Sequence, residues 1–189
     1  VEQGAEIFSF HECCITGNTY LHTLAKSELA ALAEPVPDGP RTAELIRIAR
    51  DHSAVVMAGL VEADQAGRMF NTSVAVGPEG FITTFSKLHP FINPNLTPGG
   101  GYIVIDFDGV KLGFLICYEN NLTENTGITE MMGAEIIFLP HVTCCLPSVM
   151  PGRGTVDLRL WENRTLDPVS LRLEFQGPKG REWLMRWLP

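Results

Sequence analysis

Three runs of apolar and β-branched residues dominate the middle of the chain, and only short turns separate them. The runs are SAVVMAGLVE (53–62), MFNTSVAVG (69–77) and FITTFSK (81–87), and the turns between them are DQAGR and GPEG. Turns this short join neighbouring strands into hairpins. We therefore expect consecutive strands of one sheet, with the first run buried on both faces.

A second group of strands is predicted further along the chain. YIVIDF (102–107) and KLGFLIC (111–117) flank the pair Asp108-Gly109, which is a typical hairpin turn, and EIIFLP (135–140) follows later. A short strand is also expected in AEIFSF (5–10). Strands therefore outnumber helices in the middle of the chain.

Helices are predicted on either side of these strands. Apolar residues recur at helical spacing in 20–33, where Ser27 and Glu28 are able to interrupt and restart the helix, and again in 41–52. A helix that ends near Gly133 is predicted over TENTGITEMMGA (123–134). Further helical segments are predicted after residue 160, in WENR, PVSLRLEF and GREWLMRWLP. This pattern indicates an α/β domain in which helices cover one face of a sheet. The other face of the sheet must also pack against something, and few predicted strands remain that could do so.

Composition excludes several classes of partner. A formal net charge of -8, without any Lys/Arg-rich run, argues against binding to nucleic acid or to an anionic membrane. No apolar segment approaches the roughly 20 residues of a membrane helix, and the first residues do not resemble a signal peptide.

Cysteine usage points to a reducing cytoplasm. The chain has five cysteines, two adjacent pairs and a singleton, which do not suggest a disulfide framework: Cys13, Cys14, Cys117, Cys144 and Cys145. CxxC, HxxxH and HExxH motifs are missing, so we expect no metal site.

Three chemically useful residues lie at the ends of predicted strands. FSFHE ends in Glu12, ITTFSKLH contains Lys87 at its strand end, and LGFLICYE contains Cys117. A thiolate can act as a nucleophile, a carboxylate can take and return its proton, and an ammonium can stabilise an oxyanion. Alone, Cys117 would more often be a buried structural cysteine, and Lys87 a solvated charge.

The order of these three residues resembles the nitrilase superfamily of carbon–nitrogen hydrolases. FSFHE, FSKLHPF and GVKLGFLICYE resemble its glutamate, lysine and cysteine motifs, and TPGG and GAEIIFLP follow in the expected order. The resemblance extends from about Ile7 to Pro140. It implies an α-β-β-α sandwich and cleavage of a non-peptide C–N bond in a small amide or nitrile. It also implies a cysteine thioester or thioimidate intermediate and no metal or organic cofactor.

The resemblance also assigns roles to individual residues. Cys117 is the expected nucleophile, Glu12 the general base and Lys87 the oxyanion stabiliser. The backbone N–H of Tyr118 is expected in the oxyanion hole and Glu119 in support of the site. His141 is placed at the substrate lining, although an ordinary loop histidine is the simpler interpretation for both His141 and His89.

Three departures from the family pattern limit these expectations. HECC lacks the proline that commonly precedes the glutamate, and PFINPNLTPGG (90–100) lacks the second glutamate that many members carry. We expect Asn93 or Asn95 to occupy that region. The chain also lacks candidates for the first strand and the C-terminal strands of the sandwich. It is therefore expected to form one partial domain over residues 1–189.

Two other functions stay open from the sequence. The chain is alternatively an inactive, truncated hydrolase-like domain that serves in binding or assembly, or, less simply, a redox protein that uses its paired cysteines. A low thiol pKa at Cys117 would favour the enzyme. Trp161, Trp183 and Trp187 are interpreted as packing residues, and an exposed Trp/Leu/Met stripe there would favour a homo-oligomer.

Overall fold

The computed structural model describes residues 4–142, all within one compact unit of the chain. The helical segments predicted after residue 160, with their tryptophans, and the pair Cys144–Cys145 lie outside the described residues. Whether the remaining residues belong to the same domain, as we expect from the sequence, stays a prediction.

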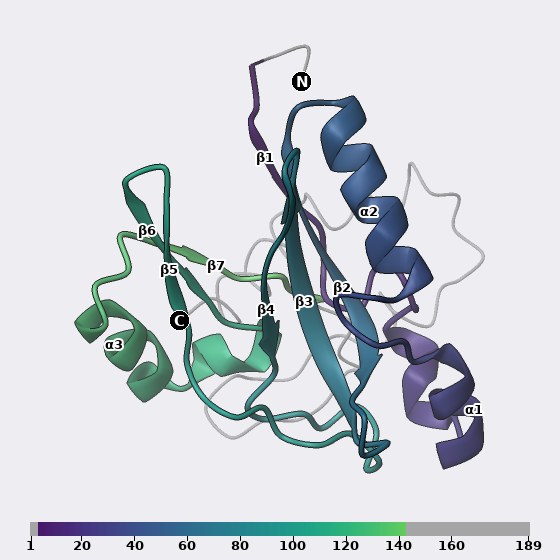
Figure 1. Cartoon of the computed structure of the whole chain (residues 1–189). Coiled ribbons are helices and arrows are strands. Elements are labelled where there is room, and N and C mark those ends of the chain that lie inside the picture. The colour runs from purple at the N-terminus through teal and green to yellow at the C-terminus, as the bar shows by residue number, and fades with distance from the viewer. Residues whose placement is uncertain (1–3, 143–189) are drawn as a thin grey trace, which may run out of the picture. The chain divides into compact units, whose positions relative to one another are not determined.

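Two β-sheets form the centre of the described structure (Figure 1). The first sheet has the order β1-β2-β3-β4, with the bounds Ile7–Ser9, Val55–Ala63, Met69–Gly77 and Gly80–Ser86. The second has the order β5-β6-β7, with the bounds Val104–Phe107, Val110–Phe114 and Ile136–Phe138.

The predicted hairpins are confirmed. β2 pairs antiparallel with β3, β3 pairs antiparallel with β4, and β5 pairs antiparallel with β6 across Asp108-Gly109. Asp108 and Gly109 both have positive φ, at 52° and 80°, as a tight hairpin turn requires. β1 and β7 lie at sheet edges, each parallel to its neighbour.

Helix α2 (Pro40–Asp51) covers the outer face of the first sheet (Figure 1). Its buried residues Leu45 and Ala49 pack against alternate residues of β2, among them Val56 and Ala58. Because side chains alternate across a strand, Val55 and Met57 face the opposite way and join the core between the two sheets. This explains why residues 54–61 are apolar without a break.

The second sheet completes the sandwich. Leu112 and Phe114 of β6 point into the core between the sheets, whereas Gly113 lies against helix α3 (Thr123–Met131). A Cβ atom at Gly113 would lie 2.4 Å from Cγ2 of Thr129, so the absence of a side chain allows α3 to pack closely. The layers are therefore α-β-β-α. The sequence pattern alone predicted one sheet, and only the family resemblance indicated two.

The helix predicted over 20–33 is wrong as a continuous element. It is a 3₁₀ helix, η1 (Thr19–Thr23), followed by α1 (Lys26–Leu32), with Leu24 and Ala25 extended between them. The helix restarts where Oε2 of Glu28 accepts a hydrogen bond from the N–H of Ala25 at 2.8 Å, one half of a capping box. None of the helices in residues 4–142 has the length and apolar character needed to cross a membrane.

Candidate active site

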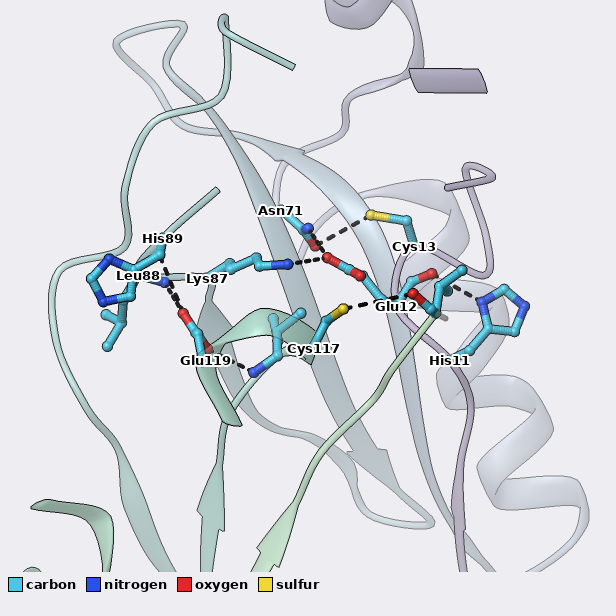
Figure 2. A network of polar contacts seen from close by, with 11 residues as sticks. His11, Glu12, Cys13, Asn71, Lys87, Leu88, His89, Cys117 and Glu119 are labelled. Atoms are coloured by element: carbon cyan, nitrogen blue, oxygen red, sulfur yellow. Dashed lines mark hydrogen bonds and ion pairs between the residues drawn. The ribbon is translucent and has the colours of Figure 1, made fainter. Parts of the chain in front are cut away.

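The three predicted site residues come together from separate segments (Figure 2). Glu12 lies three residues after β1, and Lys87 directly follows β4. Cys117 is the first residue of the 3₁₀ helix η2 (Cys117–Asn121), beyond the end of β6 at Phe114. β1 and β4 are the two edges of the first sheet, so the long Lys87 side chain spans the ends of the strands between them.

Glu12 and Lys87 form a buried ion pair. The Lys87 Nζ atom lies 2.5 Å from Oε1 of Glu12, and the two side chains are only 1% and 3% exposed. Nδ2 of Asn71 donates a second hydrogen bond to the same oxygen at 2.7 Å. A buried charge is stable in a protein only when it is paired and hydrogen-bonded in this way.

Close packing of the backbone allows the Glu12 loop to lie on the first sheet. Gly59 of β2 lies beneath it, and a Cβ atom there would be 2.3 Å from the backbone N of Cys13. Cys13 itself adopts a φ of 49°. The chain therefore turns sharply just after Glu12, over a strand position that only glycine can occupy.

Cys117 is buried and has a backbone φ of 53°, which is uncommon for a residue other than glycine. Its N–H donates to the carbonyl of Pro140 at 3.0 Å, which ties the residue to the segment after β7. Such strained conformations persist only where the surrounding structure enforces them, and they cluster at active sites.

Burial raises the pKa of the Cys117 thiol to about 11, and the negative charge of Glu12 acts in the same direction, while Lys87 opposes it. The sequence left the pKa of this thiol open. In the structure the pKa lies above its ordinary value, first because the thiol is buried and second because the nearby carboxylate disfavours another negative charge. A thiol with a raised pKa needs a base to become a nucleophile, and the Glu12 carboxylate is the acidic side chain that acts on this thiol.

Glu119 links the loop after Lys87 to the segment before Cys117. Its Oε1 accepts hydrogen bonds from the N–H groups of Leu88 and His89, the latter at 3.3 Å, and Oε2 accepts one from Ile116 at 2.6 Å. Burial raises the pKa of this carboxyl group. It touches the lysine loop through backbone groups, so its geometry fits the expected supporting position.

The loop that lacks a second glutamate is anchored by an amide. Nδ2 of Asn93 donates to the carbonyls of Leu21 and Leu24 at 2.7 and 3.0 Å, and its Oδ1 accepts from the backbone N–H and the Nδ2 group of Asn95. Asn93 thus holds the loop against η1 and makes no contact of this kind with Lys87.

Tyr118 and Phe91 form the aromatic side of the site. Their rings meet edge to face at a centroid distance of 5.7 Å, and Nζ of Lys87 lies 5.0 Å from the centre of the Phe91 ring. Phe91 is 66% exposed. The backbone N–H groups on either side of Tyr118, those of Cys117 and Glu119, donate to the carbonyls of Pro140 and Ile116. Tyr118 itself is the second residue of η2, and the first N–H groups of a helix have no partner within the helix.

His141 lies at the edge of the site. It lines an open cleft of about 480 Å³ between β1 and β7, and this lining does not include Glu12, Lys87 or Cys117. Partial burial lowers the pKa of His141, Lys87 acts in the same direction, and Glu12 opposes both. The predicted contact of His141 with substrate stays a prediction.

Asn71 and Cys13 belong to the network and were missed in the sequence. Their signal was weak: Asn71 is an amide within the predicted strand MFNTSVAVG, and Cys13 is one of two adjacent cysteines without a recognisable motif. Cys13 and Cys14 are both free thiols. Within residues 4–142, no cluster of three His, Cys, Asp or Glu side chains is placed to hold a metal ion.

Comparisons with known proteins identify the family of the chain. The family model for the carbon-nitrogen hydrolases matches residues 1–164. A nitrilase from Pyrococcus abyssi is 31% identical over 158 residues, which cover 81% of this chain and 59% of the relative. An (R)-stereoselective amidase from a Pseudomonas species is 33% identical over 117 residues, covering 61% of this chain and 42% of the relative. The chain thus spans about half the length of these two relatives.

A solved structure shows the same fold. A mutant of the amidase from Nesterenkonia sp. AN1, an enzyme of the nitrilase superfamily, is 18% identical and matches with a TM-score of 0.59 over 74% of this chain and 53% of that one. In that structure the acetamide moiety of fluoroacetamide is added covalently at the active-site cysteine. From the family match and the α-β-β-α layers, we conclude that this chain belongs to the carbon-nitrogen hydrolase family, within the nitrilase superfamily.

Proposed function

We propose that the chain carries the catalytic centre of a hydrolase that cleaves a C–N bond in a small amide or nitrile. The observation that carries this proposal is the convergence of Glu12, Lys87 and Cys117 from three distant segments into one buried cluster. Similarity to both a nitrilase and an amidase supports the reaction class and keeps both substrates open.

The first step is nucleophilic attack. Glu12 accepts the proton of the Cys117 thiol as Sγ bonds to the substrate carbon, and an electron pair moves onto the carbonyl oxygen or nitrile nitrogen. Lys87 and the backbone N–H of Tyr118 stabilise the developing negative charge. With a thiol pKa of about 11, this concerted transfer replaces a preformed thiolate.

The later steps return the enzyme to its resting state. With an amide, Glu12 gives its proton to the leaving nitrogen, the C–N bond breaks, and a thioester remains on Cys117. With a nitrile, Glu12 gives its proton to the nitrogen to form a thioimidate, and a first water adds to the thioimidate and releases ammonia, which leaves the same thioester. Glu12 then takes a proton from a water that attacks the thioester carbon and returns this proton to the sulfur, so that a carboxylic acid and the free thiol are released. The other product is ammonia from a nitrile or a primary amide, and an amine from a substituted amide.

The test combines product detection with trapping. The purified chain is incubated with a panel of small amides and nitriles, released ammonia is measured, and Cys117 is examined for an acyl group by peptide mass spectrometry. Cys117→Ala is expected to lose both signals, and Cys14→Ala, at a free thiol outside the Glu12–Lys87–Cys117 cluster, is expected to keep them. Ammonia release that survives Cys117→Ala would contradict the proposal.

An inactive binding or assembly domain is the second candidate. It is favoured by the loop 90–100, where Asn93 is committed to two carbonyls and no acidic residue is present. It predicts that amides bind without turnover and that Cys117 stays unacylated. A homo-oligomer and a cytoplasmic location also stay predictions; light scattering of the purified chain tests the first.

A further inference from the structure

We propose that Asn71 is a positioning residue that selects which oxygen of Glu12 acts as the base. It holds Oε1 of Glu12 together with Lys87, so that Oε2 is the oxygen that exchanges the proton with Cys117. This inference rests on the proposed role of Glu12 as the general base.

Asn71 is a junction between two of the three site segments (Figure 2). Its backbone carbonyl accepts the N–H of Lys87 at 2.8 Å, which sets the start of the lysine loop against β3. Its side-chain Nδ2 donates to Oε1 of Glu12 at 2.7 Å. The residue is 1% exposed, so water does not compete for these contacts.

The orientation of the Asn71 amide is fixed from its other end. Oδ1 accepts a hydrogen bond from Sγ of Cys13 at 3.2 Å. Burial raises the pKa of the Cys13 thiol to about 12, with the charge of Glu12 acting in the same direction, so this group stays a protonated donor. A thiol donor requires the amide oxygen on its side, and the NH₂ group therefore faces Glu12.

The arrangement makes the two oxygens of Glu12 unequal. Oε1 receives both Lys87 and Asn71, and the Glu12 carboxylate lies between the lysine ammonium and the sulfur of Cys117 (Figure 2). Two donors on Oε1 stabilise the negative charge there and prevent rotation of the carboxylate. In the resting structure Sγ of Cys117 donates to the carbonyl of Val142 at 3.7 Å. On the proposed role, the thiol proton passes from there to Oε2, which leaves the ion pair at Oε1 intact.

The test replaces Asn71 with leucine, which has a similar volume but neither donor nor acceptor. Asn93→Leu is the matched control, because Asn93 is equally buried and donates only to carbonyls of η1 and the residue after it. The readouts are kcat, KM, the pH profile of kcat/KM, the melting temperature, and the pH dependence of Cys117 alkylation by iodoacetamide. The titratable groups around Glu12 are Lys87, Cys117, Cys13 and His141, together with His11, whose ring contacts the Glu12 carbonyl, and all are unchanged in both variants.

We expect Asn71→Leu to move the acidic limb of kcat/KM to higher pH by about one unit, because a hydrogen bond to the carboxylate is lost. We expect kcat to fall by about 10- to 100-fold through misplacement of the base, and KM to change little. Asn93→Leu is expected to lower the melting temperature and leave the limb in place. An unmoved limb in Asn71→Leu would show that Asn71 is only structural.

Cys13 provides a second test if Asn71→Leu does not fold. Cys13→Ser keeps a donor to Oδ1 of Asn71, whereas Cys13→Ala removes it and allows the amide to turn. We expect the acidic limb to stay in place with serine and to move upward with alanine. An acidic limb of kcat/KM at the same pH in Cys13→Ser and Cys13→Ala would overturn the inference.

Failure of the proposed function is separable from failure of this inference. If the wild-type chain releases no ammonia from any amide or nitrile, the function fails, and the alkylation readout alone decides the role of Asn71. Loss of the Nδ2–H dipole beside Glu12 is expected to shift alkylation of Cys117 to higher pH in Asn71→Leu and not in Asn93→Leu. Identical alkylation profiles would overturn the inference.

Discussion

The ammonium group of Lys87 lies 2.5 Å from Oε1 of Glu12, although the two residues are 75 positions apart in the chain. Both side chains are almost fully buried, and both act on the thiol of Cys117, Glu12 by raising its pKa and Lys87 by lowering it. Removal of the charge of Glu12 and removal of the charge of Lys87 should therefore change the pKa of the Cys117 thiol in opposite directions.

Glu12→Gln is expected to speed alkylation of Cys117 while it abolishes turnover. Removing the negative charge lowers the thiol pKa from about 11, so iodoacetamide labelling moves to lower pH. Lys87→Met is expected to move labelling to higher pH. The measurement is the labelling rate of the Cys117 peptide across a pH series, and shifts of the same sign would contradict the assigned geometry.

Gly59→Ala is expected to disrupt the site through the backbone. The added Cβ would lie 2.3 Å from the backbone N of Cys13 and 3.1 Å from the carbonyl carbon of Glu12. We expect a loss of stability of about 1–3 kcal/mol from overpacking and a fall in kcat of about 100-fold.

Gly127→Ala is the matched control for Gly59→Ala. An added Cβ there meets nothing within 4 Å, and the residue lies inside helix α3. Alanine is therefore expected to stabilise the protein by about 0.5–1 kcal/mol in urea unfolding, with kcat unchanged. Equal effects of the two substitutions would show that the Glu12 loop does not rest on Gly59.

Glu119→Gln is expected to reduce stability, because one accepting oxygen is replaced by an NH₂ group that faces backbone N–H donors. The loss in free energy of unfolding is about 1–3 kcal/mol. The exposed substitution Glu130→Gln on α3 is the control and is expected to stay within about 0.5 kcal/mol of wild type.

The loss in Glu119→Gln depends on pH with a definite sign. Burial raises the pKa of Glu119 in the folded protein, so its contribution is full below the ordinary value of about 4.3 and falls as the pH rises through the folded pKa. The stability difference between wild type and Glu119→Gln should narrow with rising pH. A difference that widens would contradict this.

Phe91→Ala is expected to affect substrate binding more than folding. The ring is 66% exposed and lies over Nζ of Lys87, at the aromatic side of the site. We expect KM to rise for amides with apolar groups, kcat to change little, and the free energy of unfolding to change by about 0.5 kcal/mol or less. Steady-state kinetics with acetamide and with an aromatic amide measure the difference, and equal changes for both would count against this role.

Local sequence determined much of the architecture because its signals are short-range. Apolar runs with tight turns specify β2, β3 and β4, and Asp108-Gly109 specifies the hairpin of β5 and β6, since each depends on residues near in sequence. The interruption of the helix over 20–33 was visible at Glu28, but its position at Leu24 and Ala25 was not. Strand ends also placed Glu12, Lys87 and Cys117 as candidates.

Tertiary structure alone decided how those candidates lie relative to one another. Which sheet each strand joins depends on packing across the core, as at Gly113 and Thr129, and not on the strand's own pattern. The pKa of Cys117 rises because folding buries it beside Glu12, and Asn71 reaches Glu12 only because β3 lies between the two edges of the first sheet. Burial and contacts between distant residues exist only in the folded chain, so the sequence by itself names the reactive groups, whereas the fold sets their protonation and orientation.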